Sequence, residues 1–125
     1  MRLLLDTHIF LWAVSGNSLL KAPARRIMEG ADRVYVSAAS IWEIAIKTRL
    51  GRIDAEVDEL VRAIDASGFV ELPVRAVHAA GVAKLPLHHT DPFDRLLVAQ
   101  AIAEPLKLLT VDATLAQYSD LIMLA

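Results

Sequence analysis

The chain has 125 residues and a formal net charge of -2; 55% of its residues are hydrophobic and 22% are charged. This length predicts one domain, residues 1–125, with a buried core, and the hydrophobic excess indicates apolar surface that a partner covers. Because cysteine is absent, disulfides, thiolate metal sites and cysteine nucleophiles are excluded. The slightly acidic balance excludes a global basic field, so any contact with nucleic acid must be local.

No part of the chain is predicted to enter or cross a membrane. No apolar run reaches the roughly 18 residues that a membrane helix needs. Asp6 interrupts the N-terminal apolar run before a signal-peptide core is complete. We therefore expect a cytoplasmic protein that makes no membrane contact.

The first half of the chain predicts strands that alternate with helices. Leu3–Leu5 is a short continuous apolar run, which is typical of a strand buried on both faces of a parallel sheet. Ser37 suits the N-cap of a later helix, and Gly51 suits the end of that helix. The expected elements are a strand over 3–5, helices over 8–14 and 23–29, a strand over 33–36, and helices over 38–50 and 56–67.

The second half continues the alternation. Phe69–Leu72 forms a third strand, which Pro73 ends. Thr90 or Asp91 can cap a helix in which Pro92 takes the first position, because its missing N–H would be unpaired there anyway. The expected elements are a helix over 74–83, a loop over 84–90, a helix over 91–103, a strand over 106–110, a short helix over 111–115 and a strand over 121–124. This spacing indicates an α/β sandwich with a mainly parallel sheet and helices on both faces.

Four acidic residues are expected at one edge of this sheet. Asp6 follows the first strand and Asp112 lies just past the fourth, while Glu43 and Asp94 belong to helices entered from the same edge. Crowded carboxylates repel one another, so such a cluster is stable only when it is protonated or binds cations. Mg²⁺ and Mn²⁺ prefer oxygen ligands, activate water and neutralise charge on a phosphate. The pattern therefore predicts metal-dependent phosphodiester cleavage.

Three of the four acids also have a purely structural interpretation. Asp94 lies in the first turn of its helix, where free N–H groups favour any negative charge. Asp112 follows a strand and is placed to cap the next helix. Glu43 lies four residues before Lys47 and can form a solvated salt bridge with it. Taken alone, the local sequence leaves both roles open for these residues.

Short motifs around the acids resemble those of one known family. They are Leu4-Leu5-Asp6-Thr7, Ser40-Ile41-Trp42-Glu43-Ile44, Asp91-Pro92-Phe93-Asp94-Arg95 and Thr110-Val111-Asp112. Their order resembles that of PIN-domain ribonucleases, and the chain is similar to VapC-type toxins of toxin–antitoxin pairs. The resemblance extends over essentially all of the chain, and its force lies in the four motifs together.

The resemblance implies a fold, an activity and partners. The fold is a three-layer α/β/α PIN-like domain with a five-stranded, mainly parallel sheet. The activity is that of an endoribonuclease that depends on Mg²⁺ or Mn²⁺: activated water attacks the phosphorus in line, the 3′ oxygen leaves, and the 2′-hydroxyl serves recognition. The expected partners are the RNA substrate, a second copy in a homodimer, and a cognate antitoxin that covers or enters the active site.

The resemblance also implies a role for each acid. The expected metal ligands and catalytic residues are Asp6, Glu43, Asp94 and Asp112, which we call the acid rim. Asp91 lies one helical turn before Asp94 and is within reach of the same metal, but its place before Pro92 favours a helix cap. Thr7 and Thr110 match small hydroxyl positions near the metal, where they hydrogen-bond to its surroundings.

Basic residues near the acid rim are candidates for contact with RNA phosphates. They are Lys47, Arg49, Arg52 and Arg95, although each also suits a solvated helix face.

No histidine is assigned as a general base. The adjacent pair His88 and His89 lies in a predicted loop and is interpreted as a partly exposed turn in preference to a metal site. Trp12 and Trp42 are placed in the core or at an interface in preference to stacking on bases.

Two other classes of function are compatible with acids at strand ends. One is a catalytically silent PIN-like domain that keeps its acids for stability or for binding a partner. The other is a phosphoryl-transfer domain, against which two positions argue. A phosphatase needs a second acid where this chain has His8, and a receiver needs an acceptor aspartate where Pro73 follows the third strand.

Overall fold

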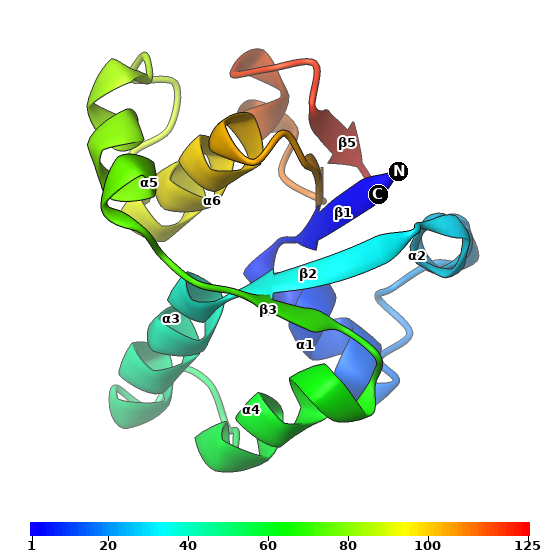
Figure 1. The fold of residues 1–125 in the computed structure, drawn as a ribbon. Helices are drawn as coiled ribbons and strands as arrows, with labels where there is room; N and C mark the ends of the chain where they lie inside the picture. The colour runs from blue at the N-terminus through cyan, green and yellow to red at the C-terminus, as the bar shows by residue number, and fades with distance from the viewer.

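The computed structural model describes residues 1–125 and contains five strands, six α-helices and two short 3-10 helices (Figure 1). In chain order these are β1 (Arg2–Leu5), α1 (Thr7–Ser15), α2 (Ala22–Gly30), β2 (Arg33–Ser37), α3 (Ala38–Arg49), α4 (Val57–Ala66), β3 (Val70–Leu72), α5 (Ala76–Gly81), η1 (Val82–Lys84), α6 (Pro92–Ala103), β4 (Lys107–Thr110), η2 (Ala113–Gln117) and β5 (Ile122–Leu124). None of the helices has the length and apolar character that a membrane crossing requires.

The five strands form one parallel sheet in the order β3-β2-β1-β4-β5. At its centre, Leu4 of β1 pairs with Tyr35 of β2 on one side and with Leu108 of β4 on the other. Leu3, Leu4 and Leu5 are fully buried, as expected of a strand that is covered on both faces. The predicted parallel sheet is therefore confirmed.

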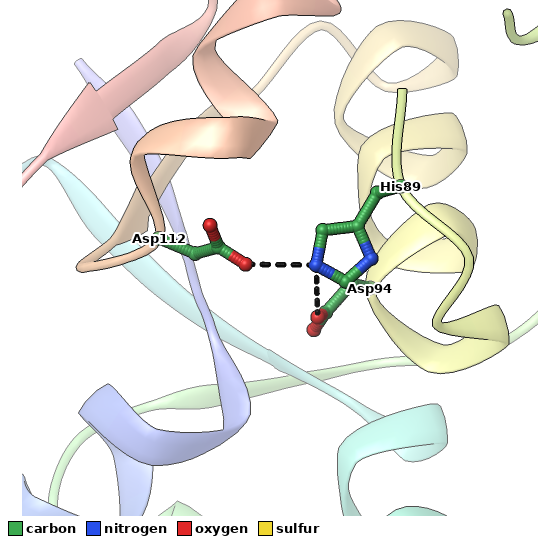
Figure 2. A group of neighbouring side chains, drawn as sticks. All are labelled: His89, Asp94 and Asp112. Atoms are coloured by element: carbon green, nitrogen blue, oxygen red, sulfur yellow. Dashed lines mark hydrogen bonds and ion pairs between the residues drawn. The ribbon is translucent and has the colours of Figure 1, made fainter. Parts of the chain in front are cut away.

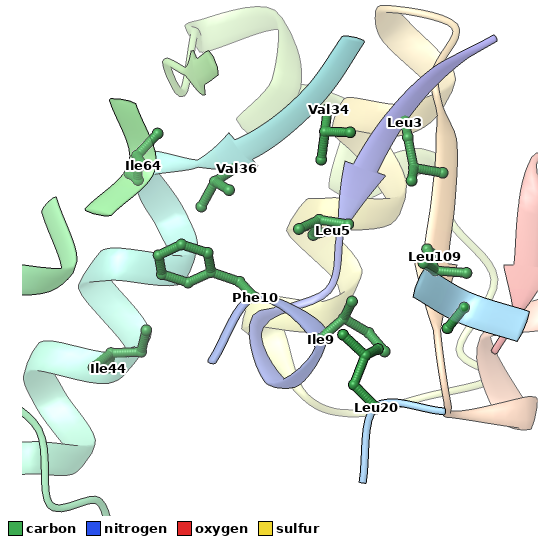
Figure 3. Close-up of a cluster of buried hydrophobic side chains, with 11 residues drawn as sticks. Leu3, Leu5, Ile9, Phe10, Leu20, Val34, Val36, Ile44, Ile64 and Leu109 are labelled. Carbon is green, nitrogen blue, oxygen red and sulfur yellow. The ribbon is translucent and has the colours of Figure 1, made fainter. Parts of the chain in front are cut away.

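Hydrophobic clusters lie on both faces of the sheet, because successive side chains of a strand point to opposite faces. Leu3 and Leu5 belong to a cluster that includes Phe10 of α1 (Figure 3). Leu4 belongs to the other cluster, together with Leu97 of α6. In Figure 1, α6 and α5 lie on one side of the sheet and α1, α3 and α4 on the other. This arrangement confirms the predicted three-layer α/β/α fold.

Two helical segments differ from the predicted ranges for identifiable reasons. The helix expected over 74–83 begins after Arg75, whose backbone N–H donates to the ring of His78 instead of continuing a helix upstream. After Gly81 it tightens into η1. The short helix expected over 111–115 begins at 113, because the carboxylate of Asp112 accepts a hydrogen bond from the Thr114 N–H and acts as its N-cap.

The carboxyl ends of three neighbouring strands lead directly into capped helices. Asp6 follows β1 and caps α1, Ser37 ends β2 and caps α3, and Asp112 lies two residues after β4 and caps η2. Parallel strands share one carboxyl edge, so the first turns of these helices converge there. This edge positions the candidate site.

Candidate metal centre

Asp6 is held in one orientation by hydrogen bonds to both of its carboxylate oxygens. Oδ1 accepts from the His8 N–H at 2.8 Å, and Oδ2 accepts from the Thr110 hydroxyl at 2.6 Å. Only 4% of the residue is exposed. Burial raises the pKa of Asp6, and these hydrogen bonds oppose the rise. Asp6 is thus a fixed, desolvated carboxylate at the end of β1.

Asp94 lies in the first turn of α6, where Asp91 aims it. Asp91 is the N-cap: its Oδ1 accepts from the Asp94 N–H at 3.0 Å, and Pro92 takes the first helical position. Burial, together with nearby negative charges, raises the pKa of Asp94 to about 7. Those charges belong to Asp6, Asp91 and Glu43. The acids of β1, α3 and α6 are therefore close enough to repel one another.

Glu43 carries a buried oxygen that no group of the protein satisfies. The residue is 3% exposed on α3, and its Oε2 accepts from Lys47 at 2.5 Å. Its Oε1 is buried and has no hydrogen-bond partner. Leaving a buried carboxylate oxygen without a partner costs free energy, which a cation bound to that oxygen would offset. The salt bridge with Lys47 considered from sequence is present, and it satisfies only half of the carboxylate.

Asp112 is held from two sides. Its Oδ1 accepts from the Thr114 N–H at 2.9 Å, and its Oδ2 lies 2.9 Å from His89 Nε2. Partial burial raises the pKa of Asp112, but hydrogen bonds from Thr114 and His89 outweigh it and hold that pKa below its usual range. The Asp112 N–H also donates to the Thr110 hydroxyl at 3.1 Å, the same hydroxyl that donates to Asp6.

His89 is a site residue that the sequence interpretation missed. It lies in the loop before α6, as predicted, but its ring is partly buried between two acids (Figure 2). Its Nε2 is 2.9 Å from Asp112 Oδ2 and 3.6 Å from Asp94 Oδ2. One ligand-type atom from each of these three residues lies within 4.8 Å of the others. The sequence feature that could have placed His89 at the site is its position immediately upstream of the helix that carries Asp94.

The two threonines occupy different surroundings. Thr110 contacts Asp6 directly, as described above. The Thr7 hydroxyl instead donates to Ser40 of α3 at 2.9 Å, and both residues are buried. Thr7 therefore joins α1 to α3 near the acid rim, while Thr110 contacts the rim itself.

The four basic candidates also divide. Lys47 is paired with Glu43, whereas Arg49 and Arg52 are exposed at and beyond the end of α3. The guanidinium of Arg95 donates to backbone carbonyls of the 82–89 segment and to Tyr118, from both of its terminal nitrogens. Arg49 and Arg52 are thus free to meet a phosphate, and Arg95 holds a loop.

The two tryptophans lie in unlike positions. Trp12 is partly buried against the cluster around Phe10. Trp42 is 58% exposed, so it is not a core residue, and it makes an edge contact with Phe93 with ring centroids 5.0 Å apart. The core placement considered for both tryptophans therefore fits Trp12 and does not fit Trp42.

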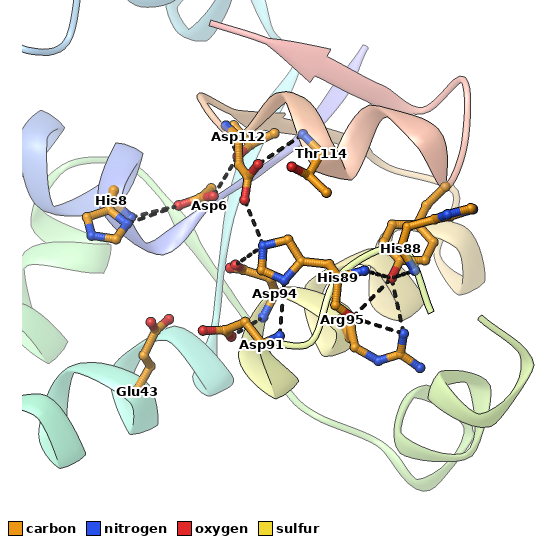
Figure 4. Close-up of polar contacts among 12 residues, drawn as sticks. Asp6, His8, Glu43, His88, His89, Asp91, Asp94, Arg95, Asp112 and Thr114 are labelled. Carbon is orange, nitrogen blue, oxygen red and sulfur yellow. Dashed lines mark hydrogen bonds and ion pairs between the residues drawn. The ribbon is translucent and has the colours of Figure 1, made fainter. Parts of the chain in front are cut away.

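Figure 4 shows the carboxylates of Asp6, Glu43, Asp91, Asp94 and Asp112 around one space. They come from the carboxyl ends of β1 and β4 and from the helices α3 and α6. Of these side chains, Asp94 and Asp112 bring one ligand-type atom each within 4.8 Å of the other and of His89. The remaining carboxylates flank that group, and Glu43 Oε1 lacks a partner. Carboxylate oxygens with an unsatisfied member are the ligand chemistry that a hard divalent cation prefers. Fold and site together define an α/β/α protein with an acidic edge whose ligand chemistry suits a divalent cation.

A family comparison makes the assignment more specific. The family model of the PIN domain matches residues 3–121. The chain belongs to the PIN domain family, as its four motifs predicted. A comparison with curated proteins finds no match.

Two solved structures of toxin–antitoxin complexes share this fold. One is VapBC2 from Rickettsia felis bound to a DNA fragment from its promoter, with a TM-score of 0.71 and 15% identity over 100% of this chain and 98% of the other. Another is a toxin–antitoxin complex from Klebsiella pneumoniae, with a TM-score of 0.66 and 17% identity over 96% of this chain and 94% of the other. At these identities the likeness establishes the fold.

Proposed function

We propose that this PIN domain is an endoribonuclease that depends on Mg²⁺ or Mn²⁺, with Asp6, Glu43, Asp94 and Asp112 as the residues that hold the cation. The observation that carries the proposal is the unbalanced charge of the acid rim. Burial and, after it, repulsion by neighbouring acids raise the pKa of Asp94 to about 7, while a buried oxygen of Glu43 lacks any partner. A bound divalent cation would offset the repulsion at Asp94 and would give the Glu43 oxygen a partner.

The residues of the chain divide the work of such a reaction. A bound cation supplies charge neutralisation at the phosphate and acidifies water. Thr110 and the His8 N–H keep Asp6 in place, and the Asp91 cap aims Asp94. Asp91 serves here as the cap of α6 and as a negative charge near Asp94; its Oδ1 accepts the cap hydrogen bond.

RNA binding is assigned to the exposed cations at the end of α3. Arg49 and Arg52 are exposed: Arg49 ends α3, the helix that carries Glu43, and Arg52 lies just beyond it. A phosphate backbone bound at the acid rim can therefore extend along these two residues. Lys47 is held by Glu43 and contributes positive charge beside that carboxylate.

A cleavage assay tests the proposal. Purified protein incubated with end-labelled RNA should cleave it with Mg²⁺ or Mn²⁺, stop with EDTA, and recover when the cation is restored. Water as the nucleophile predicts products with 5′-phosphate and 3′-hydroxyl ends, and a 2′-deoxy substitution at the cut site should permit cleavage. Undiminished cleavage in EDTA, or products with 2′,3′-cyclic phosphate ends, would overturn this mechanism.

We further propose that the chain is the toxin of a toxin–antitoxin pair and acts in the cytoplasm as a homodimer. Two of the solved structures with this fold are toxin–antitoxin complexes by their descriptions. The chain also leaves large apolar side chains exposed, among them Leu19, Trp42, Leu50, Val61, Val77 and Leu87. A groove of about 480 Å³ between α1 and α4 is lined mainly by hydrophobic residues, including Trp12 and Leu60. Such surface suits protein partners.

The antitoxin proposal predicts a small reading frame immediately upstream of the gene, and co-expression of the chain with its product tests the proposal. The neighbour's product should co-purify with the chain and suppress RNA cleavage, and light scattering should report a dimer for the chain alone. A monomeric chain would contradict the homodimer. RNA cleavage that the neighbour's product leaves unchanged would contradict the antitoxin proposal. A domain that binds the partner and never cleaves RNA would instead support the catalytically silent alternative. The PIN family assignment argues against the phosphoryl-transfer alternative.

A further inference from the structure

We infer that His89 is a positioning residue: it donates a hydrogen bond that fixes the carboxylate of Asp112 beside the N-terminus of α6, and it is not itself a ligand of the cation. This inference rests on the proposed metal-dependent function. It concerns one side chain that the proposed reaction leaves without a role, although it lies between two members of the acid rim.

The hydrogen bonds of the ring assign its proton. The backbone N–H of Asp91 donates to His89 Nδ1 at 3.0 Å, so Nδ1 acts as an acceptor and carries no proton. In the neutral ring the proton then belongs to Nε2, which lies 2.9 Å from Asp112 Oδ2. An Nε2 that carries a proton has no free electron pair for a metal. With Nδ1 also engaged, the ring bridges protein groups and offers no ligand atom.

Asp112 needs such a donor more than its neighbours do. Its side chain is 33% exposed, whereas Asp6 and Glu43 are almost completely buried. The Thr114 N–H holds only Oδ1, and His89 holds Oδ2. With both oxygens restrained, the carboxylate keeps one orientation and presents its remaining electron pairs to the space it shares with Asp94. Without His89, the carboxylate is free to turn toward solvent.

A second set of contacts holds His89 itself. The His89 N–H donates to the Tyr118 hydroxyl at 2.9 Å, and Arg95 Nη1 donates to the same hydroxyl at 3.1 Å. Arg95 also donates to the Pro86 carbonyl at 2.9 Å. We call Arg95 and Tyr118 the loop clamp. Arg95 belongs to α6 and Tyr118 follows η2, the helix that Asp112 caps, so the clamp joins the same two elements as the His89 ring.

Three variants of the full chain test the inference by binding of Mn²⁺ alone, followed by calorimetry. His89→Ala removes the donor and should weaken Mn²⁺ binding by about tenfold to a hundredfold. His89→Gln places an amide N–H near the position of Nε2 and should retain most of the wild-type affinity for Mn²⁺. His88→Ala is the matched control, because His88 contacts Tyr118 and none of the acids, and it should bind Mn²⁺ like the wild type.

Pulsed electron paramagnetic resonance of the bound Mn²⁺ separates a donor from a ligand. The wild type should lack the ¹⁴N coupling of a directly coordinated imidazole. A coupling that is present in the wild type and lost in His89→Ala would make His89 a ligand and overturn the inference. Equal Mn²⁺ affinity in His89→Ala and wild type would also overturn it.

Two further readouts keep these outcomes distinct from misfolding and from failure of the proposed function. Circular dichroism of metal-free protein reports whether each variant is folded, and His89→Gln carries the comparison if His89→Ala is not. Loss of RNA cleavage in Asp6→Asn tests the proposed function independently of His89. If RNA cleavage depends on Asp6 but Mn²⁺ affinity is the same with and without His89, the proposed function stands and only the positioning role of His89 is contradicted.

Discussion

The Thr110 hydroxyl donates a 2.6 Å hydrogen bond to Asp6 Oδ2, across 104 positions of sequence. Both residues are buried, and they stand at or just beyond the ends of the adjacent strands β4 and β1. The same hydroxyl accepts the Asp112 N–H. One threonine therefore connects an acid after the first strand to an acid after the fourth.

Replacing Thr110 by valine should destabilise the protein. The change keeps the shape of the side chain and leaves Asp6 Oδ2 buried without a donor, which costs about 1–3 kcal/mol. Urea unfolding at neutral pH in EDTA measures this loss. Thr48→Val is the matched control, since the Thr48 hydroxyl is buried and has no partner, and it should leave stability unchanged or raise it. Equal losses in both variants would contradict the role of the Thr110 hydrogen bond.

Metal-free protein should lose stability as the pH rises from about 4 to about 7. The pKa of Asp94 is raised to about 7 and that of Asp6 is raised too. Over this range the native state therefore keeps protons that the unfolded chain has released, and stability falls with pH. The lowered pKa of Asp112 acts in the opposite direction but below this range. Denaturation at pH 5 and pH 8 in EDTA measures the effect.

Asp94→Asn should remove much of that pH dependence. The amide cannot ionise. At pH 8 the free energy of unfolding of the variant should therefore exceed that of the wild type by about 1–3 kcal/mol, after allowance for screening by solvent. Asp65→Asn alters the charge equally at an exposed position of α4 and should retain the wild-type profile. A wild-type protein with the same stability at both pH values would contradict the repulsion inferred for the acid rim.

RNA binding should depend on salt through Arg49 and Arg52 and not through Arg95. In an Asp94→Asn background, which prevents cleavage, each lost phosphate contact should reduce the slope of log affinity against log salt by about 0.7. Arg49→Gln and Arg52→Gln should each show this reduction. Arg95→Gln should retain the slope and lower thermal stability, because it releases the loop clamp. A reduced slope in Arg95→Gln alone would reverse this assignment.

A buried polar network between α3 and α6 should contribute strongly to stability. The Ser37 hydroxyl accepts from the Ala39 N–H at 3.0 Å and donates to Gln100 Oε1 at 2.6 Å. Ser37→Ala removes the N-cap of α3 and leaves the buried Oε1 of Gln100 without a hydrogen-bond donor. The free energy of unfolding in urea should fall by about 2–3 kcal/mol. Ser15→Ala removes an exposed hydroxyl bonded to its own helix and should cost less than about 0.5 kcal/mol. Similar losses would contradict the network.

The sequence predicts most of the fold because its signals are local. The apolar run Leu3–Leu5 ends at Asp6, and Pro92 starts a helix after Asp91. Such patterns place strand ends and helix starts within a few residues. The parallel order of the strands then brings the acids of distant motifs to one edge.

The roles of His89 and Arg95 were not predictable in the same way. Whether a loop histidine faces solvent or an acid depends on the path of residues 82–90, which backbone contacts with Arg95 and Tyr118 fix. Tyr118 lies 29 positions beyond His89, and its single hydroxyl leaves no pattern in the sequence. The unpaired oxygen of Glu43 is likewise visible only once Lys47 and the surrounding core are placed.

Calorimetric titration of Mn²⁺ into metal-free protein tests the central claim, a cation held by the acid rim, most directly. The wild type and Asp65→Asn should give the same saturable isotherm, with at least one bound ion. Asp6→Asn and Asp94→Asn, each folded by circular dichroism, should bind at least about a hundredfold more weakly. Isotherms for these two variants that coincide with the wild type would contradict the claim.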